Sequence, residues 1–237
     1  MTPRWSVIVP AFNEVYRLPP YLDEIVQYFE GRGDPYEVVV VDDGSTDGTP
    51  ELVEARWCAT VRVLRLPRNE GKGAAVRAGM LAAKGEHRLF ADADGAAPIA
   101  ELKRLEPALA AGADVVIGSR VLVDAAVSVT ALRHRVVAGR VFNWLVARCG
   151  LKGIADSQCG FKLFTAAVAE RLFGALVTRG FAFDVELLLL AQASGCRIVE
   201  VPINWADQAG SKVAVLRHGP GMVNQIVRAR LRIWRGR

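Results

Sequence analysis

Two aspartates one residue apart, Asp92 and Asp94, directly follow the hydrophobic run at residues 88–91. Carboxylates this close repel each other, so a cation or a network of hydrogen-bond donors should accompany them. Mg²⁺ binds few protein carboxylates and completes its octahedral shell with water and substrate phosphates. The pair is therefore predicted to hold a metal ion that in turn holds a diphosphate, although an isolated Asp-x-Asp is more typical of a solvated turn.

Three other hydrophobic runs in the first half of the chain also end in polar residues. These residues are Asn13 and Glu14, Asp42 and Asp43, and Gly71 and Lys72. If the runs are parallel strands, their carboxyl ends meet at the sheet edge where ligands bind. Glu14 and Asp43 are then expected to accept hydrogen bonds from ribose hydroxyls and a base N–H, and Lys72 to contact a phosphate. The nearby glycines match neither the phosphate-binding loop nor the Gly-x-Gly-x-x-Gly of dinucleotide folds.

The elements that would position these residues alternate between strands and helices. Strands are expected at residues 5–9, 36–41, 61–66, 88–91, 114–118 and near 198–203. Helices are expected at residues 18–29, 47–57 (capped by Thr46 or Asp47), 72–83, 98–110, 133–148, 166–175 and 183–194. This alternation is typical of βαβ units and predicts an α/β fold, with a Rossmann-like, mainly parallel sheet flanked by helices. One domain is expected over residues 1–218, with a basic amphipathic helix at 219–237 as an appendage.

The composition is that of a folded protein with uneven charge. The chain has 237 residues, of which 51% are hydrophobic and 23% charged, and this excludes a disordered chain. The net charge is only +5, but arginines cluster at residues 133–148 and 228–237, which suits phosphates, nucleic acid or an anionic membrane. Nucleic acid is disfavoured because few aromatic residues accompany the clusters. The four cysteines lack Cys-x-x-Cys spacing, which argues against zinc and fits reduced cytosolic thiols.

Membrane contact is expected at the surface of a bilayer. No signal peptide is predicted, because the apolar run at residues 7–9 is short, and no run approaches the roughly 20 residues that span a bilayer. The chain is therefore expected to be cytoplasmic and peripheral on the cytoplasmic face of a membrane, with the 219–237 helix as the docking element and residues 133–148 as a second candidate. Its predicted apolar face contains Met222, Val223, Ile226, Val227, Leu231, Ile233 and Trp234, opposite Arg228, Arg232 and Arg235. The alternative is that this face packs on the domain core.

The motifs continue along nearly the whole chain. They are residues 7–14 (VIVPAFNE), 40–49 (VVDDGSTDGT), 69–73 (NEGKG), 92–94 (DAD), 118–120 (GSR), 156–164 (DSQCGFKLF), 180–186 (GFAFDVE), 201–205 (VPINW) and 210–213 (GSKV). In combination they resemble the family-2 inverting glycosyltransferases of the GT-A fold. Within that family the chain is most similar to the dolichyl- and polyprenyl-phosphate β-glucosyltransferases and the related mannosyltransferases.

The resemblance implies a nucleotide-sugar donor, Mg²⁺ or Mn²⁺ as cofactor, and a polyprenyl or dolichyl phosphate acceptor. Carried over by matching motif, Pro10, Ala11, Glu14 and Asp43 would hold the nucleoside, and Asp92 and Asp94 would hold the metal and the diphosphate. Arg120 and one of Arg133 or Arg135 would approach the donor or acceptor phosphates, and Lys212 would close the site from the carboxyl side of the chain. These four residues are the candidates for binding the acceptor phosphate. Ala96 stands where the mannosyl branch usually has Gln, so the glucosyl branch with UDP-glucose is favoured over GDP-mannose.

Other functions stay open at this point. A mannosyltransferase using GDP-mannose is one, and a family-2 enzyme acting on a saccharide hydroxyl is another. A hydroxyl acceptor would need a general base, for which Asp184 is the candidate, although a carboxylate there also suits the start of a helix. A phosphate acceptor is already anionic at neutral pH and needs no base. The intact Asp92 and Asp94 pair argues against a catalytically idle binding module.

Overall fold

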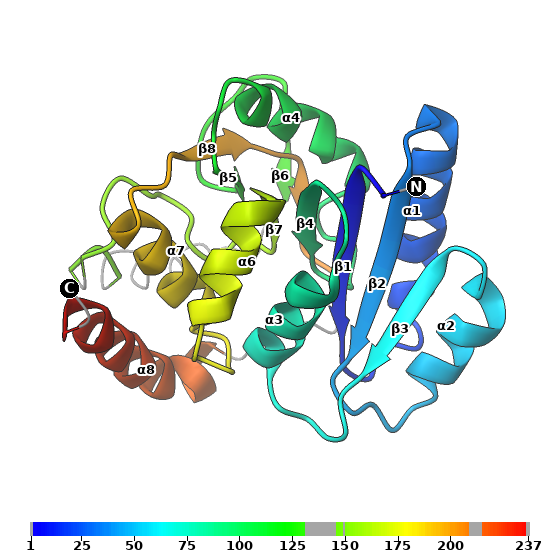
Figure 1. Ribbon diagram of the computed structural model, residues 1–237, viewed down its shortest axis with the longest axis horizontal. Coiled ribbons are helices and arrows are strands. Elements are labelled where there is room, and N and C mark those ends of the chain that lie inside the picture. Colours follow the sequence, from blue (N-terminus) through cyan, green and yellow to red (C-terminus); the bar gives the residue numbers. More distant parts are fainter. Residues whose placement is uncertain (1, 131–145, 149, 209–214, 236–237) are drawn as a thin grey trace.

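The computed structural model describes residues 2–130, 146–148, 150–208 and 215–235, with side chains undescribed at 215–220 and 223. A seven-stranded sheet with the order β3-β2-β1-β4-β7-β5-β8 forms its centre (Figure 1). The strands are β1 (Trp5–Ala11), β2 (Tyr36–Asp42), β3 (Val61–Arg65), β4 (His87–Ala91), β5 (Val115–Ser119), β7 (Phe161–Thr165) and β8 (Ile198–Pro202). β6 (Val129–Thr130) and β9 (Trp205–Ala206) make a separate two-stranded sheet. Within the large sheet, β7 runs antiparallel to both neighbours and the other pairings are parallel.

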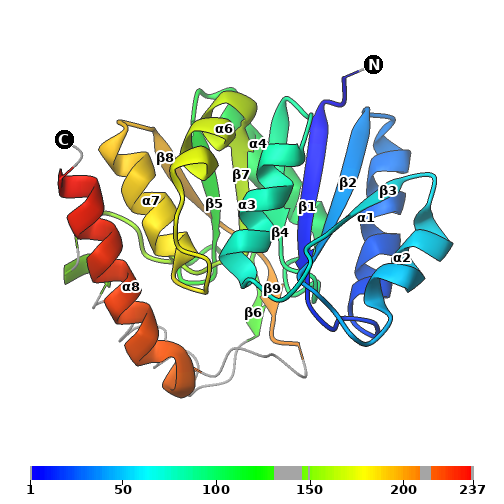
Figure 2. The same ribbon diagram turned by 60° about the horizontal axis from the view of Figure 1, so that its bottom comes forward.

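Helices cover both faces of the large sheet, as Figure 2 shows. The helices are α1 (Leu18–Arg32), α2 (Thr49–Trp57), α3 (Lys72–Ala82), η1 (Ile99–Glu101), α4 (Leu102–Ala110), α6 (Ala166–Ala175), α7 (Phe183–Ala193) and α8 (Val215–Arg235). α1, α2 and α4 pack on one face and α3, α6 and α7 on the other, with α8 against α7. Successive side chains of β1 point to opposite faces of the sheet, so Val7 and Val9 belong to one hydrophobic core and Ile8 to the other.

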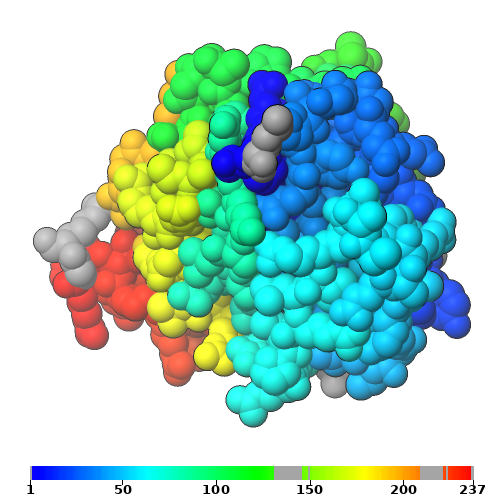
Figure 3. Space-filling model, turned by 45° about the vertical axis from the view of Figure 1, so that its right-hand side comes forward, coloured from blue at the N-terminus to red at the C-terminus, as the bar shows by residue number. Residues whose placement is uncertain are grey.

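The strands that are buried on both faces are the ones that the sequence predicts best. Continuous runs of Val and Ile, as at residues 38–41, are expected where helices cover both sides of a parallel sheet. In Figure 3 the segment that carries α2 and β3 (cyan) forms one continuous surface with the amino-terminal part of the chain (blue), and α8 (red) lies at the far margin. No helix among the described residues is both long and apolar enough to cross a bilayer.

The structure differs from the sequence-based expectation at several places, among them the unpredicted strands β6 and β9. β7, the antiparallel strand at the middle of the sheet, was not predicted, because Lys162 interrupts its apolar pattern. The N-cap residue of α2 is Gly48, not Thr46 or Asp47 as predicted. Asp47 still contributes to this end of the helix, because its Oδ1 accepts a hydrogen bond from the Thr49 backbone N–H at 3.0 Å. α8 begins at Val215, four residues before the predicted start. Of the predicted helix at 133–148, only residues 146–148 are described, and they are helical.

Gly79 on α3 offers a test of how tightly this helix packs on the sheet. A Cβ at this position would lie 2.5 Å from Ile8 Cγ2 and 2.7 Å from Val41 Cγ2. Gly79→Ala should therefore lower stability by about 1–3 kcal/mol, although alanine favours a helix by about 1 kcal/mol over glycine. Thermal and urea unfolding measure the change.

Gly174 on α6 is the matched control, because a Cβ there meets nothing within 4 Å. Gly174→Ala should leave stability unchanged or raise it slightly. If both variants were equally stable, α3 would not be in close contact with β1 and β2.

Candidate active site

The loops after β1 and β2 are fastened to each other by hydrogen bonds. Asn13 donates its backbone N–H to Ser45 Oγ at 2.8 Å, and its side-chain Oδ1 accepts the Thr46 backbone N–H at 2.8 Å. Asn13 has a left-handed backbone (φ 54°), which asparagine tolerates better than most residues. The Glu14 N–H reaches Thr49 Oγ1 at 2.9 Å. Pro10 and Ala11, the last residues of β1, therefore lie at the base of a rigid pair of loops.

Asp43 connects these loops to the start of α3. Its two carboxylate oxygens accept the backbone N–H groups of Glu70 and Gly71 at 2.7 and 2.9 Å. Burial raises the pKa of the Asp43 carboxyl, and the two N–H donors offset this only in part. The side chain is 4% exposed. Asp43 thus holds in place the loop that carries Lys72.

The aspartate pair lies at the end of β4 beside the Lys72 ammonium. Lys72 Nζ is 2.6 Å from Asp92 Oδ1 and lies over the Phe90 ring. Asp94 Oδ1 accepts the Ala96 backbone N–H at 3.1 Å. Burial and the neighbouring Asp92 raise the pKa of Asp94, and Lys72 and Arg17 act against this rise. Two cations therefore flank the two carboxylates, as their mutual repulsion requires.

Arg17 was not recognised in the sequence as a site residue. Its Nε and Nη2 donate to the Glu14 carboxylate at 2.7 and 2.5 Å, so Glu14 is already engaged by a cation. These bonds, together with the charges of Asp94 and Asp92, raise the pKa of Arg17. No local pattern identifies Arg17, because its role depends on Asp92 and Asp94, which lie more than 70 residues away along the chain.

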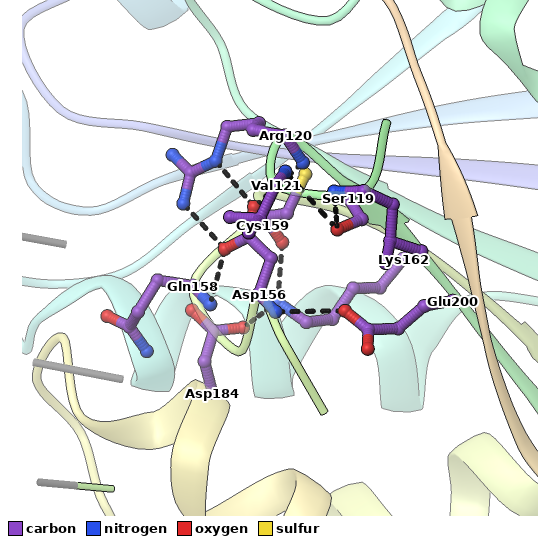
Figure 4. Close-up of polar contacts among 10 residues, drawn as sticks. Ser119, Arg120, Val121, Asp156, Gln158, Cys159, Lys162, Asp184 and Glu200 are labelled. Atoms are coloured by element: carbon purple, nitrogen blue, oxygen red, sulfur yellow. Dashed lines mark hydrogen bonds and ion pairs between the residues drawn. The ribbon is translucent and has the colours of Figure 1, made fainter. Parts of the chain in front are cut away.

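Arg120 forms a two-pronged ion pair with the buried Asp156 (Figure 4). Its Nε and Nη2 both donate at 2.8 Å, and its backbone N–H donates to the same carboxylate at 3.0 Å. Glu200 in turn accepts the backbone N–H groups of Ala155 and Asp156 at 2.7 and 2.9 Å. Burial alone would raise the pKa of Asp156, but Arg120 holds it below the ordinary value. The predicted phosphate contact is thus rigidly held, with Nη1 as the guanidinium nitrogen that Asp156 does not use.

Asp184, at the start of α7, forms a buried ion pair with Lys162 on β7 (Figure 4). Lys162 Nζ lies 2.5 Å from Asp184 Oδ1 and 2.5 Å from the Cys159 carbonyl oxygen. Burial raises the pKa of Asp184, and Lys162 and Lys72 oppose this rise. The sequence-based choice of Asp184 as a base therefore meets a carboxylate that already has a cationic partner.

The predicted residues fall into two neighbouring groups. Pro10, Ala11, Glu14, Asp43, Lys72, Asp92 and Asp94 lie at the carboxyl edge of β1, β2 and β4 or at the start of α3. Arg120 and Asp184 belong to the adjoining network around β7. Arg133, Arg135 and Lys212 lie outside the described residues.

The aspartate pair fits the donor set of a hard divalent cation. Asp92 Oδ1 is buried and makes no aligned hydrogen bond, although Lys72 Nζ is close to it. A side chain at Gly160 would overlap the Asp92 carboxylate, so glycine keeps that space clear. Among the described residues no cluster of three or more His, Cys, Asp or Glu could hold a metal. Mg²⁺ and similar ions need only one or two carboxylates when substrate phosphates supply other ligands.

Comparison with known proteins identifies the class. The profile of glycosyl transferase family 2 matches residues 6–173, and the chain belongs to this family. The α/β architecture is that of the GT-A fold, as the motifs predicted. The chain is similar over 98% of its length to glucosyl-3-phosphoglycerate synthase from Mycobacterium tuberculosis, solved in complex with Mn²⁺ and UDP-glucose (TM-score 0.71, 20% identity, 79% of that chain covered).

Within this family, the chain has higher sequence identity to one group of enzymes. The chain is 43% identical over 223 residues to the dolichyl-phosphate β-glucosyltransferase of Drosophila melanogaster, covering 88% of this chain and 68% of that protein. It is 38% identical over 250 residues to the enzyme of the same name from Dictyostelium discoideum, covering 97% and 76%. The human dolichyl-phosphate β-glucosyltransferase is 40% identical over 228 residues, covering 90% and 70%.

The Arg120–Asp156 pair leads to a prediction about stability and pH. Asp156→Asn removes the counter-charge of the partly exposed Arg120 guanidinium at a buried position, so stability at pH 7 should fall by about 3 kcal/mol, the lower end of the range for buried ion pairs. Because the folded-state pKa of Asp156 is lowered, its contribution is present above the unfolded-state pKa and is lost as pH falls through the folded-state pKa. Urea unfolding should thus show a gap between wild type and variant that is constant above about pH 5 and narrows below about pH 4.

Glu54→Gln, which removes an exposed partner of Arg65, should change stability little at any of these pH values. If the stability difference between wild type and Asp156→Asn did not change with pH, the stabilisation would not come from the ionised Asp156 carboxylate paired with Arg120.

Proposed function

We propose that this chain transfers glucose from UDP-glucose to a polyprenyl or dolichyl phosphate, with inversion at the anomeric carbon. The observation that carries the proposal is the similarity to dolichyl-phosphate β-glucosyltransferases over 88–97% of the chain, with Asp92, Asp94 and Lys72 together at one sheet edge. GDP-mannose remains the second candidate donor, and the alanine at position 96 favours glucose over it.

The donor binds across the carboxyl edge of β1, β2 and β4 in this proposal. The loops held by Asn13 and Asp43 receive the nucleoside, and Lys72 meets the phosphates. Asp92 and Asp94 hold Mg²⁺ or Mn²⁺, and the bound ion would stabilise the negative charge of the leaving diphosphate. The neighbouring cations Arg17 and Lys72 reduce the repulsion between the two carboxylates and an incoming anionic donor.

The acceptor phosphate is the nucleophile. Its oxygen forms a bond to the anomeric carbon from the face opposite the diphosphate, and the carbon–oxygen bond to UDP breaks with its electron pair. No proton has to be removed, because the phosphate is already anionic at neutral pH. Arg120 is the described residue best suited to meet this phosphate, with Arg133, Arg135 and Lys212 as further candidates. The Asp184–Lys162 pair supports a phosphate acceptor over a hydroxyl, since Asp184 is not free to act as a base.

Membrane contact through α8 follows from the lipid acceptor. Seven apolar residues of this helix were predicted to share one face, and the structure divides those that it describes. Met222, Ile226 and Ala229 are buried toward α7, whereas Val227, Leu231 and Trp234 are 43%, 46% and 73% exposed. Arg232 is also partly exposed, but its guanidinium pairs with the buried Glu186 and is therefore engaged by the protein. The exposed stripe, with Arg228 and Arg235 exposed beside it, is proposed to enter the headgroup region of an anionic membrane.

A donor and acceptor panel tests the activity. Wild-type protein should transfer labelled glucose from UDP-glucose to dolichyl phosphate, measured as label extracted into organic solvent, and should transfer much less mannose from GDP-mannose. Free dolichol, which offers only a hydroxyl, should accept no sugar.

Asp94→Ala and treatment with EDTA serve as controls in the same assay. Either change should remove several kcal/mol of transition-state stabilisation, which corresponds to a loss of turnover by a factor on the order of 100 or more. Full activity of the Asp94→Ala variant and of the EDTA-treated wild type would contradict the proposed role of the metal. Efficient transfer to dolichol would contradict a phosphate acceptor and favour a hydroxyl acceptor.

Membrane docking is tested by co-sedimentation with neutral and anionic vesicles. Each basic residue near an anionic surface contributes about 1 kcal/mol, so Arg228→Gln/Arg235→Gln should weaken binding to anionic vesicles by at least about tenfold. Trp234→Ser should weaken binding to both kinds of vesicle, because it removes apolar contact.

Arg62→Gln/Arg65→Gln is the matched control. Both arginines lie on β3, at the other end of the sheet from β8, and their side chains are 44% and 43% exposed. It should bind anionic vesicles as wild type does. An equal loss in both double variants would mean that net charge, and not α8, governs binding.

A further inference from the structure

Lys162 is a fully buried lysine to which no role has yet been given. It lies on β7, opposite Phe90 on β4 and Ile117 on β5, and its side chain is 0% exposed. Its ammonium contacts the Asp184 carboxylate and the Cys159 carbonyl oxygen, and it also lies near the Phe90 ring. A lysine at the centre of a sheet is costly to bury and calls for a physical reason.

Stability alone does not supply that reason. Removing two charges from water costs several kcal/mol for each ion, and a well-packed apolar pair of similar size is often as stable or more stable. β7 otherwise consists of apolar residues and a terminal threonine, so an apolar residue at position 162 would continue its packing. The pair is therefore better explained by what it does to its neighbours.

The neighbours of the pair are the charged residues of the donor site. Asp184 interacts electrostatically with Lys162, Lys72 and Asp92. Burial lowers the pKa of Lys72, but the charges of Asp92 and Asp184 more than offset this and raise it. The ammonium groups of Lys72 and Lys162 both lie near the Phe90 ring, 5.3 and 5.9 Å from its centre. Positive and negative groups thus alternate from Lys162 through Asp184 and Lys72 to Asp92.

We propose that Lys162 is a positioning residue for donor binding: it fixes the Asp184 carboxylate, whose charge attracts the Lys72 ammonium from beyond contact distance and so supports Asp92, which contacts that ammonium, in holding it at the donor phosphates. The proposal rests on the donor site described above. Lys162 touches no substrate in this arrangement and acts through Asp184 and Lys72. Asp184 accordingly pairs with Lys162 and attracts Lys72 through its charge, which is required even though Asp184 removes no proton.

The backbone around Lys72 explains why such an anchor is needed. Lys72 is the first residue of α3, and the glycines on both sides of it allow the 178–180 loop to approach closely. A Cβ at Gly71 would lie 2.6 Å from the Arg179 carbonyl oxygen, and one at Gly73 would lie 2.5 Å from that of Thr178. The backbone at Lys72 is therefore fixed, but a long lysine side chain still has several rotamers. The contact with Asp92, together with the charge of Asp184 further away, favours one of these rotamers.

A set of variants separates positioning from stability. Lys162→Met leaves Asp184 buried and unpaired, so its melting temperature should fall. Lys162→Met/Asp184→Asn removes both charges and should recover most of that loss. The affinity for UDP with Mn²⁺, measured by titration calorimetry, should nevertheless stay about tenfold weaker than in wild type, because Lys72 loses the attraction of one nearby negative charge.

Lys72→Met tests the route of the effect. It should weaken UDP binding in the wild type by a similar factor and should add little to the Lys162→Met/Asp184→Asn variant, because the two changes disable the same contact. Fully additive losses would show that Lys162 acts independently of Lys72 and would overturn the proposal. A double variant with both wild-type stability and wild-type affinity would overturn it as well, since the pair would then be structural only.

Arg88→Met is the matched control. Arg88 is a buried cation on β4, toward the opposite end of the strand from Asp92, where it contacts Glu170 and the Met80 carbonyl oxygen. This variant should lose stability and keep wild-type affinity for UDP, whereas an equal loss of affinity would point to general loosening and overturn the proposal. If the double variant does not fold, Asp184→Asn alone decides, because unchanged affinity in that protein would also overturn it.

The affinity of the wild type for UDP tests a different claim from the affinities of the variants relative to the wild type. Absence of UDP binding in the wild type would refute the donor proposed above, whereas the Lys162 inference depends only on the comparison between variants and wild type.

Discussion

The repulsion between Asp92 and Asp94 is the constraint on which the rest of the site depends. Two carboxylates at one strand end require positive charge on both sides, and Lys72 and Arg17 supply it. Both cations come from helix beginnings: Arg17 immediately precedes α1, and Lys72 is the first residue of α3. The positive ends of the two helix dipoles point the same way, so backbone and side chains act together. The parallel sheet brings these helix starts to one edge.

The second half of the chain completes the electrostatics from the other side. The 176–182 loop lies against the glycines beside Lys72, and its own backbone is held by Glu186, which accepts the N–H groups of Val177 and Thr178. Arg232 from α8 balances the charge of this buried carboxylate. The helix proposed to meet the membrane is therefore connected, through one carboxylate and one loop, to the residue proposed to meet the donor phosphates.

Sequence reasoning succeeded where local pattern determines structure. β1, β2 and β4 each contain an apolar run of at least three residues that is followed by polar residues, and the burial of Val38 to Val41 on both faces follows from that pattern. It failed for β7, because a charged residue at position 162 signals exposure unless its partner is known, and Asp184 lies 22 residues further along the chain. Arg17 was missed for the same reason. The positions of Asp92 and Asp94 were predictable, but the cations that neutralise them were only partly so.

The same pairing of charges bears on the nature of the acceptor. A hydroxyl nucleophile needs a carboxylate that is free to take its proton. Among the described residues at this edge, Glu14 is engaged by Arg17, Asp43 by two backbone N–H groups, Asp92 by Lys72, Asp156 by Arg120 and Asp184 by Lys162. Asp94, beside Asp92, accepts one backbone N–H and belongs to the proposed metal site. A site in which carboxylates serve to orient cations is suited to bringing two phosphates together, because attraction to fixed positive charge is what that reaction lacks in water.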